Sequence, residues 1–588
     1  TGRDLYVVAV DPRYNHRFRV RATNGASLGD RVVLRLTESP GEEEMPEGRI
    51  VDVIGPERKA SLDTEAILVH YGLHREFPAE VQREAERAAT LLEDPGERED
   101  LRQQMTFTVD PETARDFDDA LTLDRDSEGR AVVGVHIADV SHYVTPKSAL
   151  DKEARQRGNS TYLIDRVIPM LPEELSNELC SLKPGVDRLA RSVEFVLSGN
   201  GQVEQAKFRL EVICSKRRFS YEEAMAILSR EPAGDIERML HDAHRLAQKL
   251  RQARFRAGAL DLDMPEHKVL LDAKGRLSEV RRVENDVSHQ LIEEFMLLAN
   301  EGVAKEIKRR RVKAIHRVHD KPDTEKLDDL RARAALMGVR AGNLADQKQA
   351  GKFLAGLKGH LLADVFRIGY LRCMKRACYS TEPIGHYGLA KDDYVHFTSP
   401  IRRYADLIVH RIVYQHAKLD DTALATAADH ISLTERNSAD AEIDSKIIKL
   451  LTHLQRQLDR KKPETYTAMV TDVRHIGAMV DITELGLKGL VKRFSMSDDH
   501  YRFVPERGRL IGRQRGNEIA PGDQLKVEIE AIDLQKKQAD FRVIKTKPSK
   551  GKKKNTSRSR KPRRGQKPDH SPKRRDTQKQ PKAKRRQK

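Results

Sequence analysis

The 588-residue chain contains no tryptophan, only four cysteines and few aromatic residues, which make up 5% of the sequence. The cysteines do not show the spacing of a zinc motif, and a disulfide framework is not expected in so long a chain. No stretch approaches the roughly 20 apolar residues that a membrane span requires. The first ten residues lack the basic start and apolar run of a secretion signal. We therefore expect a cytoplasmic protein without a membrane partner, a disulfide framework or a zinc site.

Positive charge is concentrated at one end of the chain, which carries +17 overall. Residues 545–588 contain 21 Lys or Arg against two Asp, a net charge of +19, so residues 1–544 carry −2. Because this segment has no apolar pattern, it cannot bury enough surface to offset the entropy of the chain. We predict that residues 545–588 form a disordered basic tail. Its charge would attract the phosphates of RNA, including those of the ribosome, whatever the RNA sequence.

The length of the chain indicates several domains, since a single core stops growing near about 250 to 300 residues. Short apolar runs between Gly, Pro and Asn turns predict a small β-barrel at the start of the chain. Five such runs near the end predict a second barrel of OB type.

Between the two barrels, strand-like and helical stretches mix, which is typical of an α+β body. Helical spacing of apolar residues predicts helices at Ser288 to Arg310, Leu354 to Met374 and Leu424 to His453. The predicted division of the chain is a first barrel at 1–56, a helical linker at 57–105, an α+β domain at 106–460, a second barrel at 464–543 and the tail at 545–588.

Four aspartates, Asp110, Asp116, Asp118 and Asp119, fall within ten positions, after an apolar run and before a strand-like one. Like charges gather around a cation, and carboxylate oxygens with water are the ligands that suit magnesium. Two magnesium ions about 3.5 to 4 Å apart can activate water and stabilise the leaving oxygen in phosphodiester hydrolysis. A solvated acidic loop and a calcium site are the alternatives, although the segment lacks the glycine at position six and the final Glu of the usual calcium loop.

Four longer segments, arranged as two pairs, give further evidence about the function of this domain. Residues 110–119 (Asp-Pro-Glu-Thr-Ala-Arg-Asp-Phe-Asp-Asp) and 136–143 (His-Ile-Ala-Asp-Val-Ser-His-Tyr) come first, and residues 386–389 and 394–410 follow near the other end of the same domain. In this order they resemble the catalytic domain of the ribonuclease II/ribonuclease R family. The resemblance implies a multidomain α+β protein with an RNB-type catalytic domain flanked by OB-fold barrels, the first of them cold-shock-like. The family commonly has two tandem cold-shock domains and only one fits before Pro56, so we expect the chain to lack the first.

The resemblance implies a processive 3′-to-5′ exoribonuclease, acting as a monomer, that hydrolyses single-stranded and structured RNA to 5′-monophosphates with two magnesium ions. The basic tail is closer to the ribonuclease R type than to the ribonuclease II type. Two alternatives stay open: a ribonuclease II-like enzyme that duplex RNA stalls, and a non-catalytic RNA-binding regulator with the same fold. By motif position, the four aspartates would hold the metal ions, and Asp116, Asp118 and Arg402 would act in catalysis.

The resemblance also marks residues that would contact RNA. Tyr162 matches a position at which the family clamps a base near the 3′ end, and an aromatic face stacks on any base. A core tyrosine is the alternative. Arg402 and Arg403 have guanidinium forks that match phosphate oxygens, with an ordinary surface pair as the alternative. The cations expected to grip single-stranded RNA in the last barrel are Lys488, Lys492 and Arg493.

Overall fold

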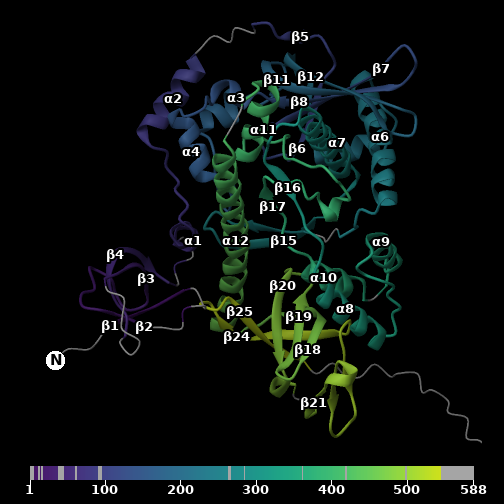
Figure 1. Cartoon of the computed structure of the whole chain (residues 1–588). Helices are drawn as coiled ribbons and strands as arrows, with labels where there is room; N and C mark the ends of the chain where they lie inside the picture. Colours follow the sequence, from purple (N-terminus) through teal and green to yellow (C-terminus); the bar gives the residue numbers. More distant parts are fainter. Residues whose placement is uncertain are drawn as a thin grey trace, which may run out of the picture. The chain divides into compact units, whose positions relative to one another are not determined.

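The structure of the chain is a computed structural model (Figure 1). It describes residues 5–10, 14, 17–37, 45–57, 59, 62–90, 96–262, 266–283, 285–360, 362–417, 420–496 and 499–544. The basic segment 545–588, whose composition predicts a disordered tail, lies outside the described residues. Among the residues described, no helix is long and apolar enough to cross a membrane.

The first domain is a four-stranded β-sheet in the order β1-β2-β4-β3. Its strands are β1 (Leu5–Val8), β2 (Arg17–Val20), β3 (Asp30–Leu36) and β4 (Glu47–Pro56). In β4, Ile50 is buried between the exposed Arg49 and Val51, which is the alternation that a one-sided sheet requires. The β-structure of this region agrees with the alternating pattern in the sequence.

Two helices and one strand connect this sheet to the central domain. α1 (Asp63–Tyr71) ends at Gly72, whose left-handed φ of 64° stops the helix, and α2 (Ala79–Thr90) follows it. The third element, β5 (Glu99–Leu101), pairs in parallel with β12 (Val203–Cys214), a strand of the sheet in the central domain. The prediction of a purely helical linker is therefore wrong in its last part, because a three-residue strand with two acidic side chains carries no apolar pattern.

The central domain is built on a seven-stranded sheet in the order β13-β6-β7-β8-β11-β12-β5. Its further strands are β6 (Phe107–Asp110), β7 (Asp119–Arg125), β8 (Ala131–Ala138), β11 (Asp187–Leu197), β12 (Val203–Cys214) and β13 (Arg217–Ser220). The strands β7, β8, β11 and β12 are antiparallel neighbours, whereas the edge strands β13 and β5 pair in parallel. Most residues of β8 and β11 are buried, so this part of the sheet lies inside the domain.

Helices pack on the sheet and complete the main core. α6 (Asp235–Ala257) packs on α7 (Val287–Arg310), which contacts β8 and β11, and α11 (Tyr404–Tyr414) contacts α3 (Val140–Tyr143). The fully buried aromatic side chains of this core are Phe107, Phe195, Phe219, Phe295 and Phe397. The smaller elements of the domain are α4 (Ala149–Arg157), β9 (Thr161–Tyr162), β10 (Val167–Ile168), a π-helix (Glu174–Leu179), α5 (Tyr221–Leu228), β14 (Glu266–Leu271), β15 (Leu277–Val283), β16 (His316–Val318) and β17 (Cys378–Ser380).

Two of the three predicted helices are confirmed. α7 matches the first, and α12 (Asp421–Asp459), a single helix of 39 residues, contains the third. The prediction of one helix from Leu354 to Met374 is wrong, since α9 (Gln347–Gly356) and α10 (Ala363–Cys373) are separate. Gly359 lies between them with a left-handed φ of 78°, which an α-helix does not allow. Together with α8 (Thr324–Leu336), these helices surround a small core of their own.

The last domain is a closed barrel of five strands in the order β18-β19-β20-β25-β24, which confirms the predicted five-stranded barrel. Its strands are β18 (Thr465–Arg474), β19 (Gly477–Ile482), β20 (Leu487–Lys492), β24 (Gln524–Asp533) and β25 (Gln538–Val543). Between β20 and β24 the chain forms a second, three-stranded sheet of β21 (Tyr501–Val504), β22 (Arg509–Gly512) and β23 (Glu518–Ile519).

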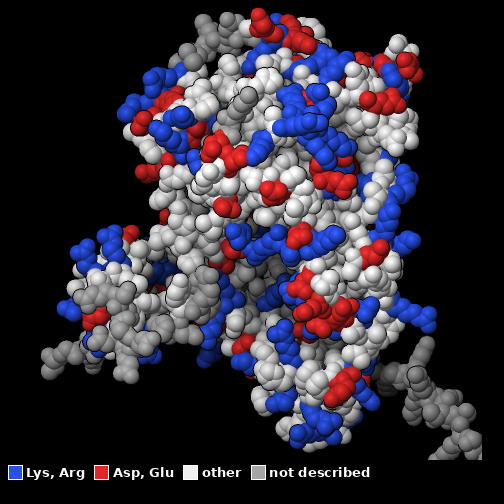
Figure 2. All heavy atoms as spheres, in the orientation of Figure 1, with Lys and Arg blue, Asp and Glu red and all other residues white. Residues whose placement is uncertain are grey.

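Charged side chains of both signs are mixed over the visible face of the described residues (Figure 2). This agrees with the net charge of −2 that residues 1–544 carry. Attraction of RNA phosphates to this part of the chain must therefore come from local groups of cations, because a general positive potential is missing.

Candidate active site

The four aspartates meet at one end of two neighbouring strands. Asp110 is the last residue of β6, Asp119 is the first residue of β7, and Asp116 and Asp118 lie in the loop between them. Because β6 and β7 are paired and antiparallel, the loop returns the chain to the edge at which it left the sheet. A local feature of the sequence is thus enough to gather these carboxylates.

The carboxylates are crowded and poorly solvated. Burial, together with the charge of Asp119, raises the pKa of Asp110 to about 8. Burial also raises the pKa of Asp118 well above its usual range, although the charge of Arg402 opposes the shift. The pKa of Asp119 is raised to about 6 by burial, against the same opposing charge. Bound cations between such carboxylates would favour their ionised forms.

Magnesium fits this arrangement as an ion shared with a substrate. Within the described residues, no three Asp, Glu, His or Cys side chains lie close enough together to hold one ion by themselves. Mg²⁺ does not need such a cage, because it keeps several waters and binds through one or two carboxylates together with substrate phosphates. The Oδ2 atom of Asp110 is buried and has no hydrogen-bond partner in the described part of the chain, which leaves it free to act as a ligand.

Arg402 is brought to the aspartates from the other end of the domain. The backbone N–H of Ile401 donates to Oδ1 of Asp118 at 2.9 Å, across 283 positions of sequence. The Nε atom of Arg402 lies 3.5 Å from Oδ2 of the same carboxylate, and 44% of the arginine side chain is exposed. Asp118 is therefore oriented by a backbone group and a cation, and part of that cation remains open to solvent.

Arg403 points to a different partner. Its Nε donates to Oδ2 of Asp406 at 2.9 Å, and its Nη2 donates to Oδ1 of Asp406 at 2.7 Å. Asp406 has no exposed surface. The guanidinium of Arg403 is thus committed to a buried ion pair, and its predicted contact with RNA stays a prediction.

Tyr162, predicted to clamp a base, lies at the aspartate cluster. It is the last residue of β9, its side chain is 38% exposed, and its hydroxyl donates to Oδ2 of Asp116 at 3.4 Å. Burial of the hydroxyl, aided by the negative charge of Asp116, raises the pKa of Tyr162. Ser160, two residues before Tyr162, donates its backbone N–H to the carbonyl of Arg402 at 3.0 Å. The structure therefore brings the tyrosine and arginine motifs together beside the carboxylates.

Tyr221 and His289 are additional residues at this place that the sequence analysis did not single out. Their rings stack with centroids 3.9 Å apart and an angle of 11° between the planes. Tyr221 directly follows Ser220, the cross-strand neighbour of Asp110. Burial, and then the charges of Asp119 and Asp110, raises the pKa of the Tyr221 hydroxyl. Aromatic residues are rare in this chain, so the position of Tyr221 directly after a strand is the sequence feature that could have marked it as a site residue.

The three cations predicted to bind RNA in the last barrel lie apart from the aspartates, on β20 and the turn that follows it. Lys488 is the cross-strand neighbour of Asp481, and Lys492 forms an ion pair with Asp540 at 2.6 Å. The guanidinium of Arg493 lies 4.8 Å from the ring centroid of Phe494, which is 83% exposed. An RNA-binding function for these residues stays a prediction, and Phe494 is an aromatic surface that the sequence analysis missed.

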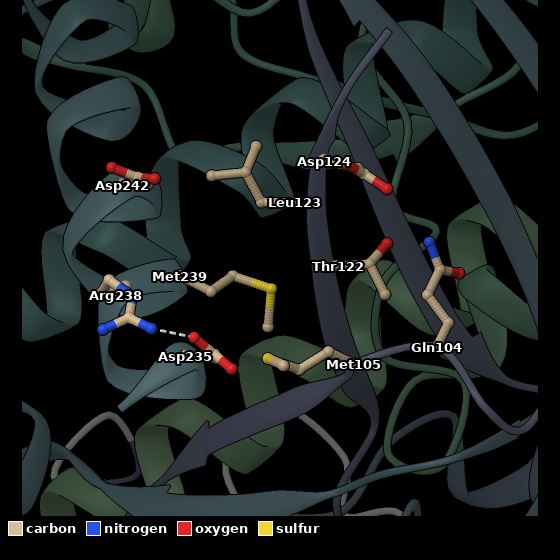
Figure 3. A pocket seen from close by; sticks show the side chains of 9 residues that line it. All are labelled: Gln104, Met105, Thr122, Leu123, Asp124, Asp235, Arg238, Met239 and Asp242. Carbon is tan, nitrogen blue, oxygen red and sulfur yellow. Dashed lines mark hydrogen bonds and ion pairs between the residues drawn. The ribbon is translucent and has the colours of Figure 1, made fainter. Parts of the chain in front are cut away.

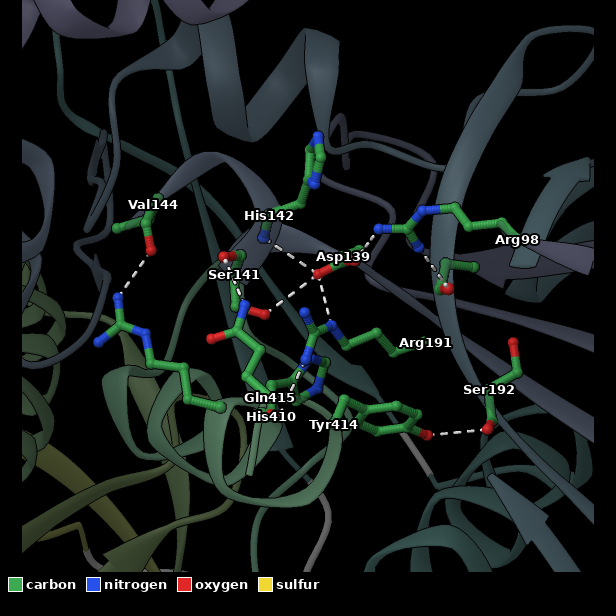
Figure 4. A network of polar contacts seen from close by, with 12 residues as sticks. Arg98, Asp139, Ser141, His142, Val144, Arg191, Ser192, His410, Tyr414 and Gln415 are labelled. Atoms are coloured by element: carbon green, nitrogen blue, oxygen red, sulfur yellow. Dashed lines mark hydrogen bonds and ion pairs between the residues drawn. The ribbon is translucent and has the colours of Figure 1, made fainter. Parts of the chain in front are cut away.

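Asp139, in the motif 136–143, is the centre of a buried polar network (Figure 4). Its two carboxylate oxygens accept from Arg98 and Arg191 at 2.6 Å each, and Arg191 also donates to the carbonyl of His410 at 2.9 Å. Burial alone would raise the pKa of Asp139, but the two arginines lower it to about 2. This network joins β8 and β11 to α11, the helix that follows Arg402 and Arg403, and so stabilises the framework of the site.

A cleft of about 370 Å³ lies away from the aspartate cluster, between β7 and α6 (Figure 3). Its lining includes Asp124, Asp235 and Asp242, and its one arginine, Arg238, forms an ion pair with Asp235. A surface with this excess of negative charge repels RNA phosphates. The cleft is therefore no part of the candidate active site.

Comparison with known proteins assigns each domain to a family. The RNB domain matches residues 98–418, the cold shock domain residues 6–78 and the S1 RNA binding domain residues 460–544. Ribonuclease R of Thermotoga maritima is 37% identical over 563 residues, which cover 92% of this chain and 79% of the relative. The match to RNB alone spans more than half of the chain.

Solved structures show the same likeness. Mycoplasma genitalium RNase R in complex with ribose methylated single-stranded RNA has a TM-score of 0.82 and 27% identity, covering 91% of this chain and 86% of that one. The same enzyme in complex with double-stranded RNA has a TM-score of 0.78 and 26% identity, covering 91% and 93%. The chain therefore belongs to the ribonuclease R family of 3′-to-5′ exoribonucleases.

Proposed function

We propose that this exoribonuclease degrades RNA processively and releases 5′-monophosphates with two magnesium ions at the aspartate cluster. The observation that carries the proposal is the meeting of an acidic cluster, a partly exposed arginine and a partly exposed tyrosine around Asp116 and Asp118. Metal-assisted cleavage of a phosphodiester beside a stacked base requires these three kinds of group.

Asp110, Asp116, Asp118 and Asp119 would hold the magnesium ions, directly or through water. When bound, the metal would supply an activated water and neutralise charge on the leaving oxygen. The contribution of the protein is to fix the ligands before the substrate arrives. Asp118 illustrates this, because Ile401 and Arg402 hold its two oxygens in place.

Arg402 would contact the scissile phosphate. Its guanidinium already lies against Asp118, and the exposed part of the side chain can donate to phosphate oxygens. A cation held in place where negative charge develops needs little rearrangement during the reaction, which makes such a contact effective. Arg402 is thus proposed as a catalytic residue together with Asp116 and Asp118.

We propose that structured RNA is a substrate as well as single-stranded RNA. The basis is the likeness to the Mycoplasma genitalium enzyme, whose complexes contain single-stranded and double-stranded RNA. The first alternative is an enzyme of ribonuclease II type that stops when it meets a duplex. The second is a non-catalytic RNA-binding regulator, which the presence of all four aspartates disfavours.

One assay separates these three possibilities. A hairpin with a single-stranded 3′ overhang, labelled at its 5′ end, is incubated with the full chain and either magnesium or EDTA. We expect a magnesium-dependent ladder that passes through the stem and ends in short products, and no cleavage in EDTA. A ladder that stops at the base of the stem supports the ribonuclease II-like reading, and binding without cleavage in magnesium refutes the proposed activity.

Tyr162→Ala is expected to weaken binding of the RNA 3′ end by about 5- to 150-fold, because a stacked base contributes roughly 1–3 kcal/mol. Tyr162→Phe removes only the hydroxyl that contacts Asp116, so it serves as the matched control and should bind nearly as tightly. The measurement is the dissociation constant of a short RNA in calcium, with hydrolysis suppressed. Equal affinity for the wild-type and Ala enzymes would exclude the clamp.

Several further predictions belong to this proposal. The basic residues 545–588 would add attraction for phosphates that weakens steeply with salt, and association with ribosomes would follow from the same charge. The monomeric state and the cytoplasmic location also stay predictions.

A further inference from the structure

The turn that presents Arg402 makes two separate contacts with Asp118. Residues 399–403 form this turn just before α11, and the backbone N–H groups of Arg402 and Arg403 both donate to the carbonyl of Ser399, at 3.3 and 3.0 Å. Ile401 and Arg402 then supply the backbone and guanidinium contacts to Asp118. A small movement of the turn would shift both contacts, so the geometry of the site depends on what holds the turn.

A single buried carboxylate holds it at both ends. Asp406, in the first turn of α11, accepts from the backbone N–H of Ser399 at 2.8 Å with Oδ1. At the other end of the turn, Arg403 donates to both oxygens of Asp406, at 2.7 and 2.9 Å. Ser399 and Arg403 are thereby tied to one rigid group on the helix.

Ser399 passes the constraint on to Arg402. Its hydroxyl oxygen accepts from Nη2 of Arg402 at 3.0 Å, and the serine itself is only 4% exposed. The guanidinium is therefore placed between the hydroxyl of Ser399 and the carboxylate of Asp118. The contacts run in sequence from Asp406 to Ser399, from Ser399 to Arg402, and from Arg402 to Asp118.

The surroundings of Asp406 indicate that its carboxylate serves to hold the turn. Its neighbours Leu407, Ile408 and Val409 are buried and apolar. A buried ion pair in such a place is weak evidence for stability, because removing two charges from water costs several kcal/mol and an apolar residue often serves as well. What the carboxylate adds is the directed attachment of a backbone N–H and a guanidinium fork.

We propose that Asp406 is a positioning residue for the exoribonuclease reaction, which fixes Arg402 against Asp118 through Ser399 without contacting the substrate. This inference rests on the catalytic function proposed for Arg402. It also gives Arg403 a defined task, since its guanidinium is the counter-charge that permits a carboxylate to lie at this buried position.

Asp406→Asn in the full-length chain tests the proposal. The amide keeps an oxygen that can accept from the backbone N–H of Ser399, but it places an NH₂ group, which cannot accept, against the guanidinium of Arg403. The substitution therefore loosens the turn and hardly changes the volume of the side chain. We expect the single-turnover rate at saturating RNA and magnesium to fall by about 100-fold, the scale known for displacing a reacting group by about 1 Å. The dissociation constant for RNA should stay within about twofold of the wild-type value. Ser399→Ala, which keeps the backbone bond to Asp406, should lower the rate in the same way and provides the test if Asp406→Asn does not fold.

A double-mutant cycle with Arg402→Ala shows whether the effect runs through Arg402. In the Arg402→Ala background, adding Asp406→Asn should lower the rate by no more than about tenfold, instead of about 100-fold, because only the contact of Ile401 with Asp118 is left to shift. A larger further loss overturns the positioning function. If Arg402→Ala alone leaves the rate unchanged, the catalytic function proposed for Arg402 fails instead.

Asp151→Asn is the matched control. Asp151 is also a buried carboxylate that holds α11, accepting from the Tyr404 hydroxyl and from Arg411 at 2.8 Å each. Within the described part of the chain it makes no hydrogen bond or ion pair with residues 399–403. Asp151→Asn should lower the melting temperature of the protein, but it should not cause the selective fall in single-turnover rate that is expected for Asp406→Asn. A fall in rate with the same dependence on Arg402 would mean that any displacement of α11 has this effect, and would contradict a specific function of Asp406.

Discussion

Asp118→Asn is expected to lower the single-turnover rate of RNA hydrolysis by about 100- to 1,000-fold, the scale for losing one fixed electrostatic contact to the reacting groups. The change removes the negative charge that would hold magnesium, while the amide oxygen can still accept from Ile401. RNA affinity should change little, because contacts along the rest of the strand persist. Filter binding in the absence of turnover and a single-turnover assay at saturating RNA measure the two quantities separately.

Asp124→Asn provides the control for charge alone. Asp124 lies on β7 five positions after Asp119, its side chain is exposed, and it belongs to the lining of the separate acidic cleft. It should leave both rate and affinity near the wild-type values. If Asp118→Asn weakened RNA binding as much as it slowed hydrolysis, Asp118 would be a binding residue, and its assignment to catalysis would be wrong.

Asp139→Asn is expected to lower the free energy of unfolding of the catalytic domain by about 3–5 kcal/mol. The two guanidinium groups of Arg98 and Arg191 remain buried, with side chains 9% and 3% exposed, and lose their shared counter-charge. Urea unfolding, followed by a probe in the catalytic domain, measures the loss. The backbone of α3 is affected too, because Oδ1 of Asp139 accepts from the N–H of His142 at 3.1 Å.

The pH dependence of this loss has a defined sign. The folded pKa of Asp139, about 2, lies below its ordinary value of 3.8, so its ionisation stabilises the fold above pH 3.8. That stabilisation disappears as the pH falls from about 4 toward 2, where the folded carboxylate takes up its proton. The difference in stability between wild type and Asp139→Asn should therefore be constant near neutral pH and shrink below pH 4.

Asp187→Asn is the control that removes an exposed ion pair from β11, the strand that carries Arg191. Asp187, the first residue of β11, accepts from Arg102 at 3.0 Å, and the side chains are 53% and 44% exposed. Solvent screens such a pair, so its loss should leave stability nearly unchanged. A loss as large as that of Asp139→Asn would mean that burial does not account for the effect.

Interactions between residues close in sequence could be predicted from the sequence alone. The aspartate cluster is such a case, because a loop between two paired strands keeps Asp110, Asp116, Asp118 and Asp119 together whatever surrounds them. The five strands of the last barrel and helices α7 and α12 follow from apolar spacing over a few residues. The error at Leu354 to Met374 has the opposite cause, since the pattern continues through Gly359 although the backbone turns there.

Partners far apart in sequence were decided only by the tertiary structure. Motif resemblance placed Arg402 and Arg403 in one functional pair, yet the fold turns Arg402 to Asp118 and Arg403 to Asp406. The direction of a side chain depends on contacts across hundreds of positions, which no local pattern encodes. The stacking of Tyr221 on His289 and the addition of β5 to the catalytic sheet have the same origin. The sequence by itself therefore determined which chemical groups the chain carries, and the tertiary structure decided which side chains meet the four aspartates and which hold them in place.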